Sequence, residues 1–160
     1  MSVMASKKSI HIESPYLLPS KAIREALESK ARKGIDVKII VPGDKTNTPY
    51  TRWASHSFYA GMIESGIHIY EYQPSMMHAK TMTMDDKWSI VGSANLDNRS
   101  SRINLELILG IDDVSFAKDM EEKFSTDIGN AKEVTKEDAQ KYSTLLFPLE
   151  WGSRLFIQQY

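Results

Sequence analysis

The chain has 160 residues and a formal net charge of −1, with 41% hydrophobic and 26% charged residues. This length suits one domain whose core needs no disulfide or metal, and the composition excludes a disordered chain. The sequence contains no cysteine, which excludes thiol catalysis, disulfide bonds and cysteine-ligated metals. The near-zero charge argues against a protein held to nucleic acid by bulk charge, so any anion site must be local.

The apolar segments are short throughout the sequence. The longest, 37–41 and 105–111, are far from the length that a bilayer-spanning helix requires. Residues 1–8 lack the apolar core of a secretion signal. We therefore expect a soluble domain with no signal or transmembrane segment.

The chain opens with the pattern of a strand, a helix and a second strand. Apolar alternation over 9–13 predicts the first strand, and the loop that follows ends at Ser20, a favourable helix N-cap. Apolar residues at helical spacing predict a helix over 21–33, with Gly34 at its C-cap. A β-branched run over 36–41 is typical of a buried strand in an α/β sheet.

Alternation and helical spacing continue along the rest of the chain. The remaining predicted elements are a helix over 49–65, strands over 67–72, 77–84, 88–91 and 103–111, and helices over 115–128 and 135–146. Thr135 and Asp138 begin the last helix with a pattern close to a capping box. Strands interleaved with helices predict an α/β fold, an α-β-α sandwich whose mixed sheet carries helices on both faces. We expect a single domain over 1–160.

An imidazole and an ammonium are paired in the predicted strand over 77–84. Because side chains alternate along a strand, His78 and Lys80 share one face, and Asp85 points to the opposite one. An unpaired buried charge is costly, so this pair suits a bound anion. A neutral imidazole could attack phosphorus while the lysine balances the charge on the phosphate oxygens.

Small polar residues follow the next predicted strand. Gly92 permits close backbone approach, and Ser93 and Asn95 offer short hydrogen-bonding side chains at alternate positions. This segment is a candidate oxyanion clamp. Glu106 shares a face with Asn104, and its carboxylate could fix the tautomer of His78.

The order of these residues resembles the signature of the phospholipase D superfamily, His-x-Lys-x4-Asp followed by Gly-Ser-x-Asn and a downstream acidic residue. The resemblance implies a phospholipase D-like fold. It also implies that His78 is the nucleophile, that Lys80 and Asn95 bind the phosphate, and that Glu106 pairs with the histidine. Asp85 would be structural. The chemistry so implied needs no metal or other cofactor.

Flanking segments make the chain most similar to the second half of bacterial-type cardiolipin synthases, over roughly residues 9–128. They are Ser14-Pro15-Tyr16, the run over 34–42, Ile69-Tyr70-Glu71-Tyr72, and the run over 92–100. Departures from that family are Ser101 and Leu105, where phenylalanine is usual, and the residues from Ala131 onward. The likeness implies phosphatidyl transfer between two phosphatidylglycerols and a parent protein at the bacterial cytoplasmic membrane.

Simpler interpretations apply to several of these residues taken singly. A lone histidine in a strand is usually a core or surface residue, which is our interpretation of His11, His56 and His68. Ser93 and Arg99 are candidate substrate-binding residues, although Arg99 and its neighbour Arg102 could equally be surface charges.

The signature occurs once, whereas the superfamily's mechanism needs a second histidine to protonate the leaving group. Either a longer parent chain or a homodimer would supply the second half. A homodimer would favour a single-motif phosphodiesterase or nuclease acting on nucleic acid. A third possibility is a non-catalytic half that serves in dimerisation or phosphate binding.

Overall fold

The computed structural model describes residues 3–97 and 104–145, with side chains described as far as Tyr142. The elements are η1 (Val3–Ala5), β1 (Ser9–Glu13), β2 (Leu17–Leu18), α1 (Lys21–Arg32), β3 (Asp36–Pro42), α2 (Pro49–Glu64), β4 (His68–Tyr72), β5 (Thr81–Met84), β6 (Trp88–Gly92), β7 (Leu96–Asp97), β8 (Ile108–Asp112), α4 (Val114–Gly129), β9 (Ala131–Glu133) and α5 (Lys136–Leu145). Among these helices, none is both long and apolar enough to cross a bilayer.

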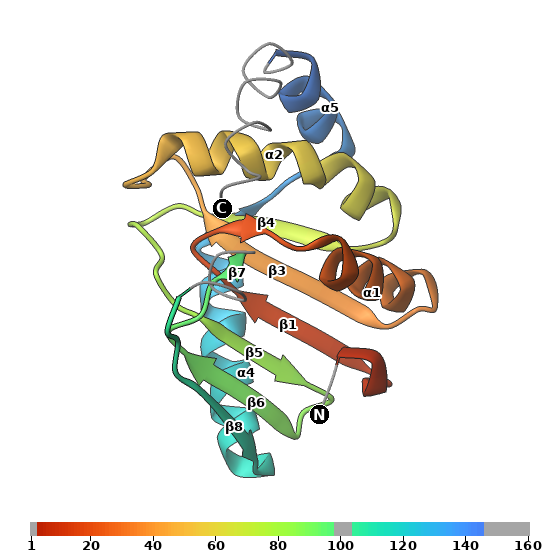
Figure 1. Ribbon diagram of the computed structural model, residues 1–160, viewed down its shortest axis with the longest axis vertical. Helices are drawn as coiled ribbons and strands as arrows, with labels where there is room; N and C mark the ends of the chain where they lie inside the picture. Colours follow the sequence, from red (N-terminus) through yellow and green to blue (C-terminus); the bar gives the residue numbers. More distant parts are fainter. Residues whose placement is uncertain (1–2, 98–103, 146–160) are drawn as a thin grey trace.

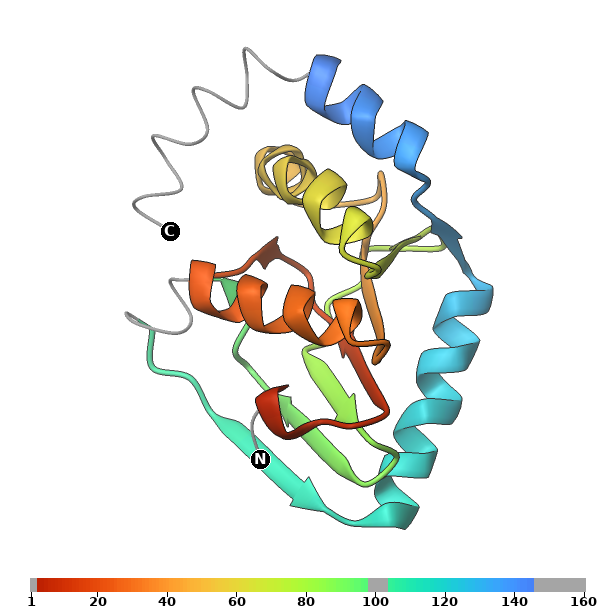
Figure 2. The same ribbon diagram turned by 90° about the vertical axis from the view of Figure 1, so that its right-hand side faces the viewer.

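A seven-stranded mixed sheet forms the centre of the fold, in the order β8-β6-β5-β1-β3-β4-β9 (Figure 1). β1, β3 and β4 run parallel, and the other neighbouring strands pair antiparallel. Helices α1 and α2 cover one face and α4 covers the other (Figure 2). The predicted α-β-α sandwich is therefore confirmed.

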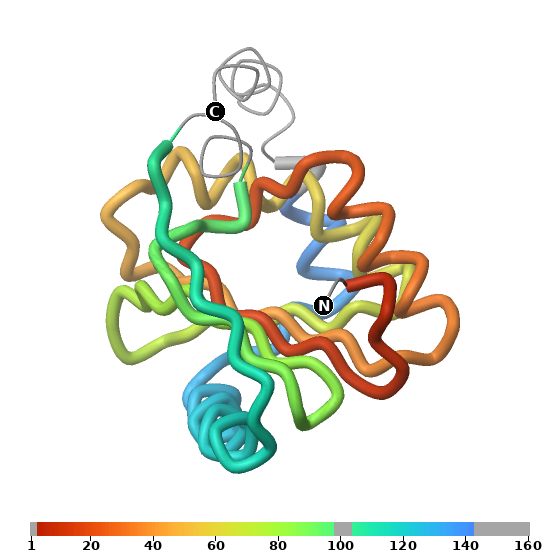
Figure 3. The backbone as a smooth tube through the Cα atoms, turned by 60° about the horizontal axis from the view of Figure 1, so that its bottom comes forward, coloured from red at the N-terminus to blue at the C-terminus, as the bar shows by residue number. Residues whose placement is uncertain are grey.

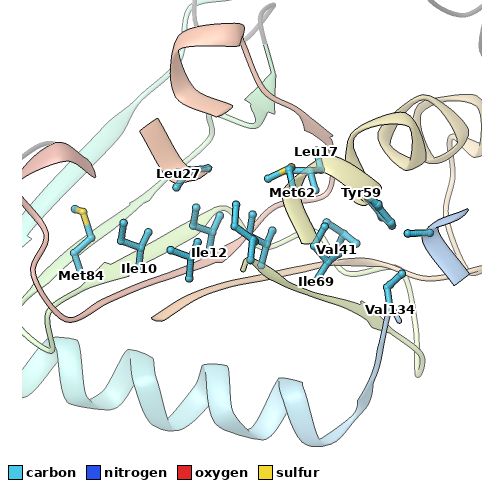
Figure 4. Packing of buried hydrophobic residues seen from close by; sticks show 14 residues of the cluster. Ile10, Ile12, Leu17, Leu27, Val41, Tyr59, Met62, Ile69, Met84 and Val134 are labelled. Carbon is cyan, nitrogen blue, oxygen red and sulfur yellow. The ribbon is translucent and has the colours of Figure 1, made fainter. Parts of the chain in front are cut away.

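The main core lies between the sheet and the helices α1 and α2 (Figure 4). Ile10 and Ile12 of β1 point into it and are almost fully buried, as are Leu27 of α1 and Met62 of α2. Ile40 of β3 points the other way, into a smaller cluster beneath α4. Burying such a side chain stabilises the fold by about 1.5–3 kcal/mol, which explains the β-branched run in β3.

The predicted helix boundaries agree closely with the observed ones. Ser20 accepts a hydrogen bond from the backbone N–H of Ile23, and Gly34 takes a φ of 82° after α1. Thr135 and Asp138 form the predicted capping box, since each side chain accepts from the other's backbone N–H.

Two predicted strands are shorter than expected. β5 begins at Thr81 rather than 77, because its pairing with β1 ends at Glu13 and its pairing with β6 ends at Val91. β8 begins at Ile108 rather than 103, and residues 104–107 have no strand pairing. The short strands β2 and β7, which pair in parallel, and β9 at the sheet edge were missing from the expected elements.

Asp85 lies in the turn between β5 and β6, with a φ of 57°. Its carboxylate accepts hydrogen bonds from the hydroxyl of Ser6 and from the backbone N–H groups of Lys7, Lys8 and Ser9. Burial would raise the pKa of this carboxyl, but these donors lower it to about 2. The contacts join the turn to the chain that leads into β1, at the end of the sheet opposite His78.

Replacing Asp85 by Asn should lower the free energy of unfolding by about 2 kcal/mol at pH 7, since an amide accepts fewer of these bonds and repels some donors. The stabilisation from the ionised carboxylate is fully present above its unfolded pKa near 3.8 and is lost as the pH falls through the folded value of about 2. Urea denaturation at pH 7 and pH 3 measures both effects. Asp86→Asn, at a neighbouring position with a φ of 55°, is the control. An equal loss in both variants would contradict this role.

Candidate functional site

His78 lies in the irregular segment between β4 and β5, not in a strand as predicted. The chain turns at Ser14-Pro15 after β1, so the residues before Thr81 lose a pairing partner on that side. His78 is exposed at this end of the sheet. Partial burial and the positive charge of Lys80 both lower the pKa of its imidazole, which favours the neutral form.

Lys80 stands beside His78 and its ammonium donates a hydrogen bond to the His78 carbonyl oxygen at 3.1 Å. Partial burial lowers the pKa of Lys80, and the carboxylates of Glu106 and Asp97 act in the opposite direction by attraction. Two acidic side chains are therefore close enough to influence the ammonium electrostatically.

Lys80 and Asn95 line one pocket of about 180 Å³, which we call the Lys80 pocket. Its apolar lining includes Ile12, Met82 and Ile90 from three neighbouring strands. The side-chain oxygen of Asn95 is buried and has no hydrogen-bond partner among the described residues. A buried amide oxygen without a partner can accept a hydrogen bond from a ligand.

Gly92 allows the segment that carries Glu106 to approach β6 closely. A Cβ at this position would lie 2.3 Å from the carbonyl oxygen of Leu107. The backbone N–H of Ser93 donates to the carbonyl oxygen of Leu107 at 2.9 Å, and the Ser93 hydroxyl accepts from the backbone N–H of Leu107 at 3.0 Å. The close contact with the backbone of Leu107 therefore requires glycine at position 92.

Ser93 and Asn104 both hold Glu106. The Ser93 hydroxyl donates a short hydrogen bond to one carboxylate oxygen, and the Asn104 amide donates to the other at 3.2 Å. These contacts place Ser93 against Glu106, and substrate binding by Ser93 stays a prediction. Orientation of His78 by Glu106 stays a prediction. Arg99 and Arg102 lie outside the described residues.

Ser14 is a residue of the site that the sequence interpretation missed. It is buried, and its hydroxyl donates to the carbonyl oxygen of Tyr16 at 2.8 Å and accepts from the backbone N–H of Leu96 at 3.0 Å. It thereby joins the loop after β1 to the residue next to Asn95, and the two segments lie side by side (Figure 3). Its place before Pro15 was the available signal, but Ser14 was interpreted only as part of the Ser14-Pro15-Tyr16 segment that resembles cardiolipin synthases and of the loop after the first strand.

The histidine and acidic side chains do not form a metal cluster in the described parts of the chain, 3–97 and 104–145. No group of three or more histidine, aspartate or glutamate side chains converges there in a way that could hold a metal ion. Among the described residues that line the Lys80 pocket, Lys80 is the cationic one.

Known proteins resemble this chain in sequence. Residues 2–128 match the family model described as cardiolipin synthase, PLD-like domain. A cardiolipin synthase 1 from Staphylococcus epidermidis is 38% identical over 135 residues, which are 84% of this chain and 27% of that protein. A cardiolipin synthase from Staphylococcus aureus is 34% identical over 141 residues, 88% of this chain and 28% of that protein. The chain thus spans little more than a quarter of the length of these relatives.

Solved structures share the fold. Nuc from Salmonella typhimurium, described as a phospholipase D family member, has a TM-score of 0.70 at 22% identity, covering 82% of this chain and 84% of its own. Phosphatidylserine synthase from Haemophilus influenzae has a TM-score of 0.71 at 14% identity, covering 96% of this chain and 42% of its own. The fold, the order of the motif residues and the family match lead to one conclusion: the chain belongs to the phospholipase D-like domain family of the cardiolipin synthases.

Proposed function

We propose that this chain is the carboxyl-terminal catalytic half of an enzyme that transfers phosphodiesters through a phosphohistidine at His78. The observation that carries the proposal is the convergence of Lys80 and Asn95 on one pocket next to a histidine whose neutral form is favoured. Lys80 supplies positive charge for the phosphate oxygens, and Asn95 lines the same pocket, where its amide N–H groups would donate to them.

The reaction has two displacements at phosphorus. In the first, an imidazole nitrogen of His78 forms a bond to phosphorus, and the bond to the leaving alcohol breaks as that oxygen takes a proton from an acid. In the second, an alcohol or water attacks phosphorus, the bond to His78 breaks, and the attacking oxygen gives up its proton. Glu106 would stabilise the charged imidazolium through its carboxylate.

We propose a phosphatidylglycerol-like phospholipid as the substrate, with the glycerol hydroxyl of a second molecule as the acceptor. Support comes from the curated relatives, which are named as cardiolipin synthases and are 34–38% identical to this chain. The motif residues His78, Lys80 and Asn95 are all present in the order that this family uses.

A second histidine has to complete the site. We propose that the half that carries it docks on an exposed apolar edge of the sheet. β8 is an edge strand of the described sheet (Figure 1). Leu105, Leu107, Ile108 and Leu109, which we call the β8 strip, are all highly exposed, and Leu107 is 79% exposed. An exposed apolar group of this size on a strand edge marks an interaction surface. It lies next to Glu106, so a partner bound there would reach the site.

A homodimeric phosphodiesterase or nuclease is the second candidate. The chain covers 84% of the solved Nuc chain, so a fold of this kind occurs in a chain of similar length. Product analysis separates the two: transfer of a phosphatidyl group to an alcohol supports the first proposal, and hydrolysis of a nucleic-acid diester without transfer supports the second.

Replacing His78 by Ala should reduce transfer by at least a thousandfold, because it removes the proposed nucleophile. The assay uses the active assembly, in which this half is complemented by a second half. His68→Ala is the control, since His68 is an exposed histidine of β4 paired with Glu133. Full activity of the His78 variant would eliminate the mechanism.

The pH profile gives an independent check on the nucleophile. Protonated imidazole cannot attack phosphorus, so activity should fall with decreasing pH along a limb set by His78. Because partial burial and Lys80 lower the pKa of His78, we expect this limb below pH 6.5. Lys80→Gln should move the limb to higher pH as well as slowing the reaction. A limb that is unchanged in this variant would contradict the coupling.

Replacing Leu107 by Lys should weaken association with the second half at least tenfold, because a charge enters the β8 strip. Light scattering over a range of protein concentrations measures association if the second half is another copy, at twice 18.2 kDa. If the second half belongs to the same polypeptide, transfer activity is measured instead of association. Val114→Lys, a similarly exposed residue at the start of α4, is the control. Equal behaviour of the two variants would place the partner elsewhere.

A further inference from the structure

Glu13 is a buried carboxyl that the proposed mechanism does not use. It is the last residue of β1, it is only 5% exposed, and it lines the Lys80 pocket together with Thr81. Burying an ionised carboxylate costs free energy unless hydrogen bonds or charges compensate for the lost water. Buried carboxyls of this kind concentrate at functional sites, so Glu13 is a candidate for a role in the pocket that it lines.

The carboxyl of Glu13 is bound to the first residue of β5. The Thr81 hydroxyl donates a hydrogen bond to one of its oxygens at 2.6 Å, and the two residues are register partners in the sheet. This distance is at the short end of the range for a hydroxyl donor, as expected for a strong hydrogen bond to a carboxylate. The contact therefore fixes Thr81 at the point where the pairing between β1 and β5 ends.

A second carboxyl, that of Asp127 in α4, interacts with Glu13 from the face of the sheet that α4 covers. Burial raises the pKa of Glu13, the Thr81 hydroxyl lowers it, and Asp127 raises it again. Two neighbouring carboxyls repel each other when both are ionised, whereas a hydroxyl donor stabilises the ionised form. The hydrogen bond from Thr81 is thus the contact that favours the carboxylate of Glu13.

Lys80 immediately precedes the residue that Glu13 holds. On the β6 side, the carbonyl oxygen of Lys80 accepts a hydrogen bond from the backbone N–H of Gly92 at 3.2 Å. On the β1 side, Glu13 holds the Thr81 side chain. The peptide between Lys80 and Thr81 is therefore fixed from both neighbouring strands, which limits the directions that the Lys80 side chain can take.

We propose that Glu13 is a positioning residue of the site, which acts through Thr81 to hold the Lys80 ammonium beside His78 and in place for the phosphate. This role rests on the proposed function, in which Lys80 binds the phosphate. Loss of the contact would loosen the first residue of β5, and the ammonium would move away from the imidazole. Because Lys80 is the charged group that lowers the pKa of His78, that pKa reports the position of the ammonium.

The pH titration of the His78 ring in the purified chain, followed by nuclear magnetic resonance, tests this role without relying on activity. Thr81→Val keeps the size of the side chain and removes the donor, so it should raise the pKa of His78 by at least half of the shift that Lys80→Gln produces. Thr81→Ser, which keeps the hydroxyl, should titrate as the wild type. Thr83→Val is the matched control, because Thr83 lies further along the same face of β5 and hydrogen-bonds to another carboxyl, that of Glu121. An unchanged titration in Thr81→Val, or an equal shift in Thr83→Val, would overturn the proposal.

Variants of Glu13 give a second check on the same contact. Glu13→Ala should raise the pKa of His78 as Thr81→Val does, and the double variant should show no further shift, because both changes break one hydrogen bond. Glu13→Gln, whose amide oxygen still accepts from Thr81, should restore most of the wild-type titration. Additive shifts in the double variant would contradict a role through Thr81. If Glu13→Ala fails to fold, the Thr81 variants decide the question.

Kinetics of the active assembly test the consequence for transfer. Thr81→Val should lower kcat/KM at least tenfold and move the acidic limb of the pH profile to higher pH, whereas Thr83→Val should leave both unchanged. An unchanged kcat/KM in Thr81→Val would overturn the positioning role. Failure of the proposed function is recognised separately, by a His78→Ala variant that still cleaves and transfers.

Discussion

The backbone pairing of β5 ends at Thr81, and the geometry of the candidate site depends on that end point. On one side β1 stops at Glu13 and the chain turns at Pro15, and on the other side the pairing with β6 reaches Val91. His78 and Lys80 come just before Thr81, and Asn95 comes just after the end of β6. Lys80 and Asn95 therefore line one pocket at this end of the sheet, although they come from two separate loops, and the ammonium of Lys80 contacts the carbonyl oxygen of His78. Ser14 stabilises this arrangement, because its buried hydroxyl joins the loop after β1 to the backbone next to Asn95.

Charge around Lys80 connects the parts of the site. The ammonium lowers the pKa of His78 and is itself attracted by Glu106 and Asp97, which lie in segments on either side of residues 98–103. The two carboxylates thus act electrostatically on the ammonium that we propose as the phosphate ligand.

Much of the fold follows from local sequence, and the departures have physical reasons. Ser20, Gly34 and the Thr135–Asp138 capping box fixed helix ends because their side chains or φ angles act within a few residues. Strand ends were less predictable, since the alternation over 77–84 continues past the point where β1 and β6 stop pairing. The motif residues could be named from their order, yet the contacts of Ser93 with Glu106 and of Ser14 with Leu96 join residues far apart in the chain. Spacing alone does not reveal such contacts.

The central claim is that His78 becomes covalently attached to phosphorus during turnover, and trapping that adduct tests it most directly. The active assembly would be mixed with a phosphatidylglycerol substrate, quenched within one turnover and digested under conditions that preserve phosphoramidates. Mass spectrometry should then find the peptide containing His78 heavier by one phosphatidyl group, and unmodified in the His78→Ala variant. A substrate turned over with no adduct on His78, or with the adduct on another residue of this chain, would contradict the account.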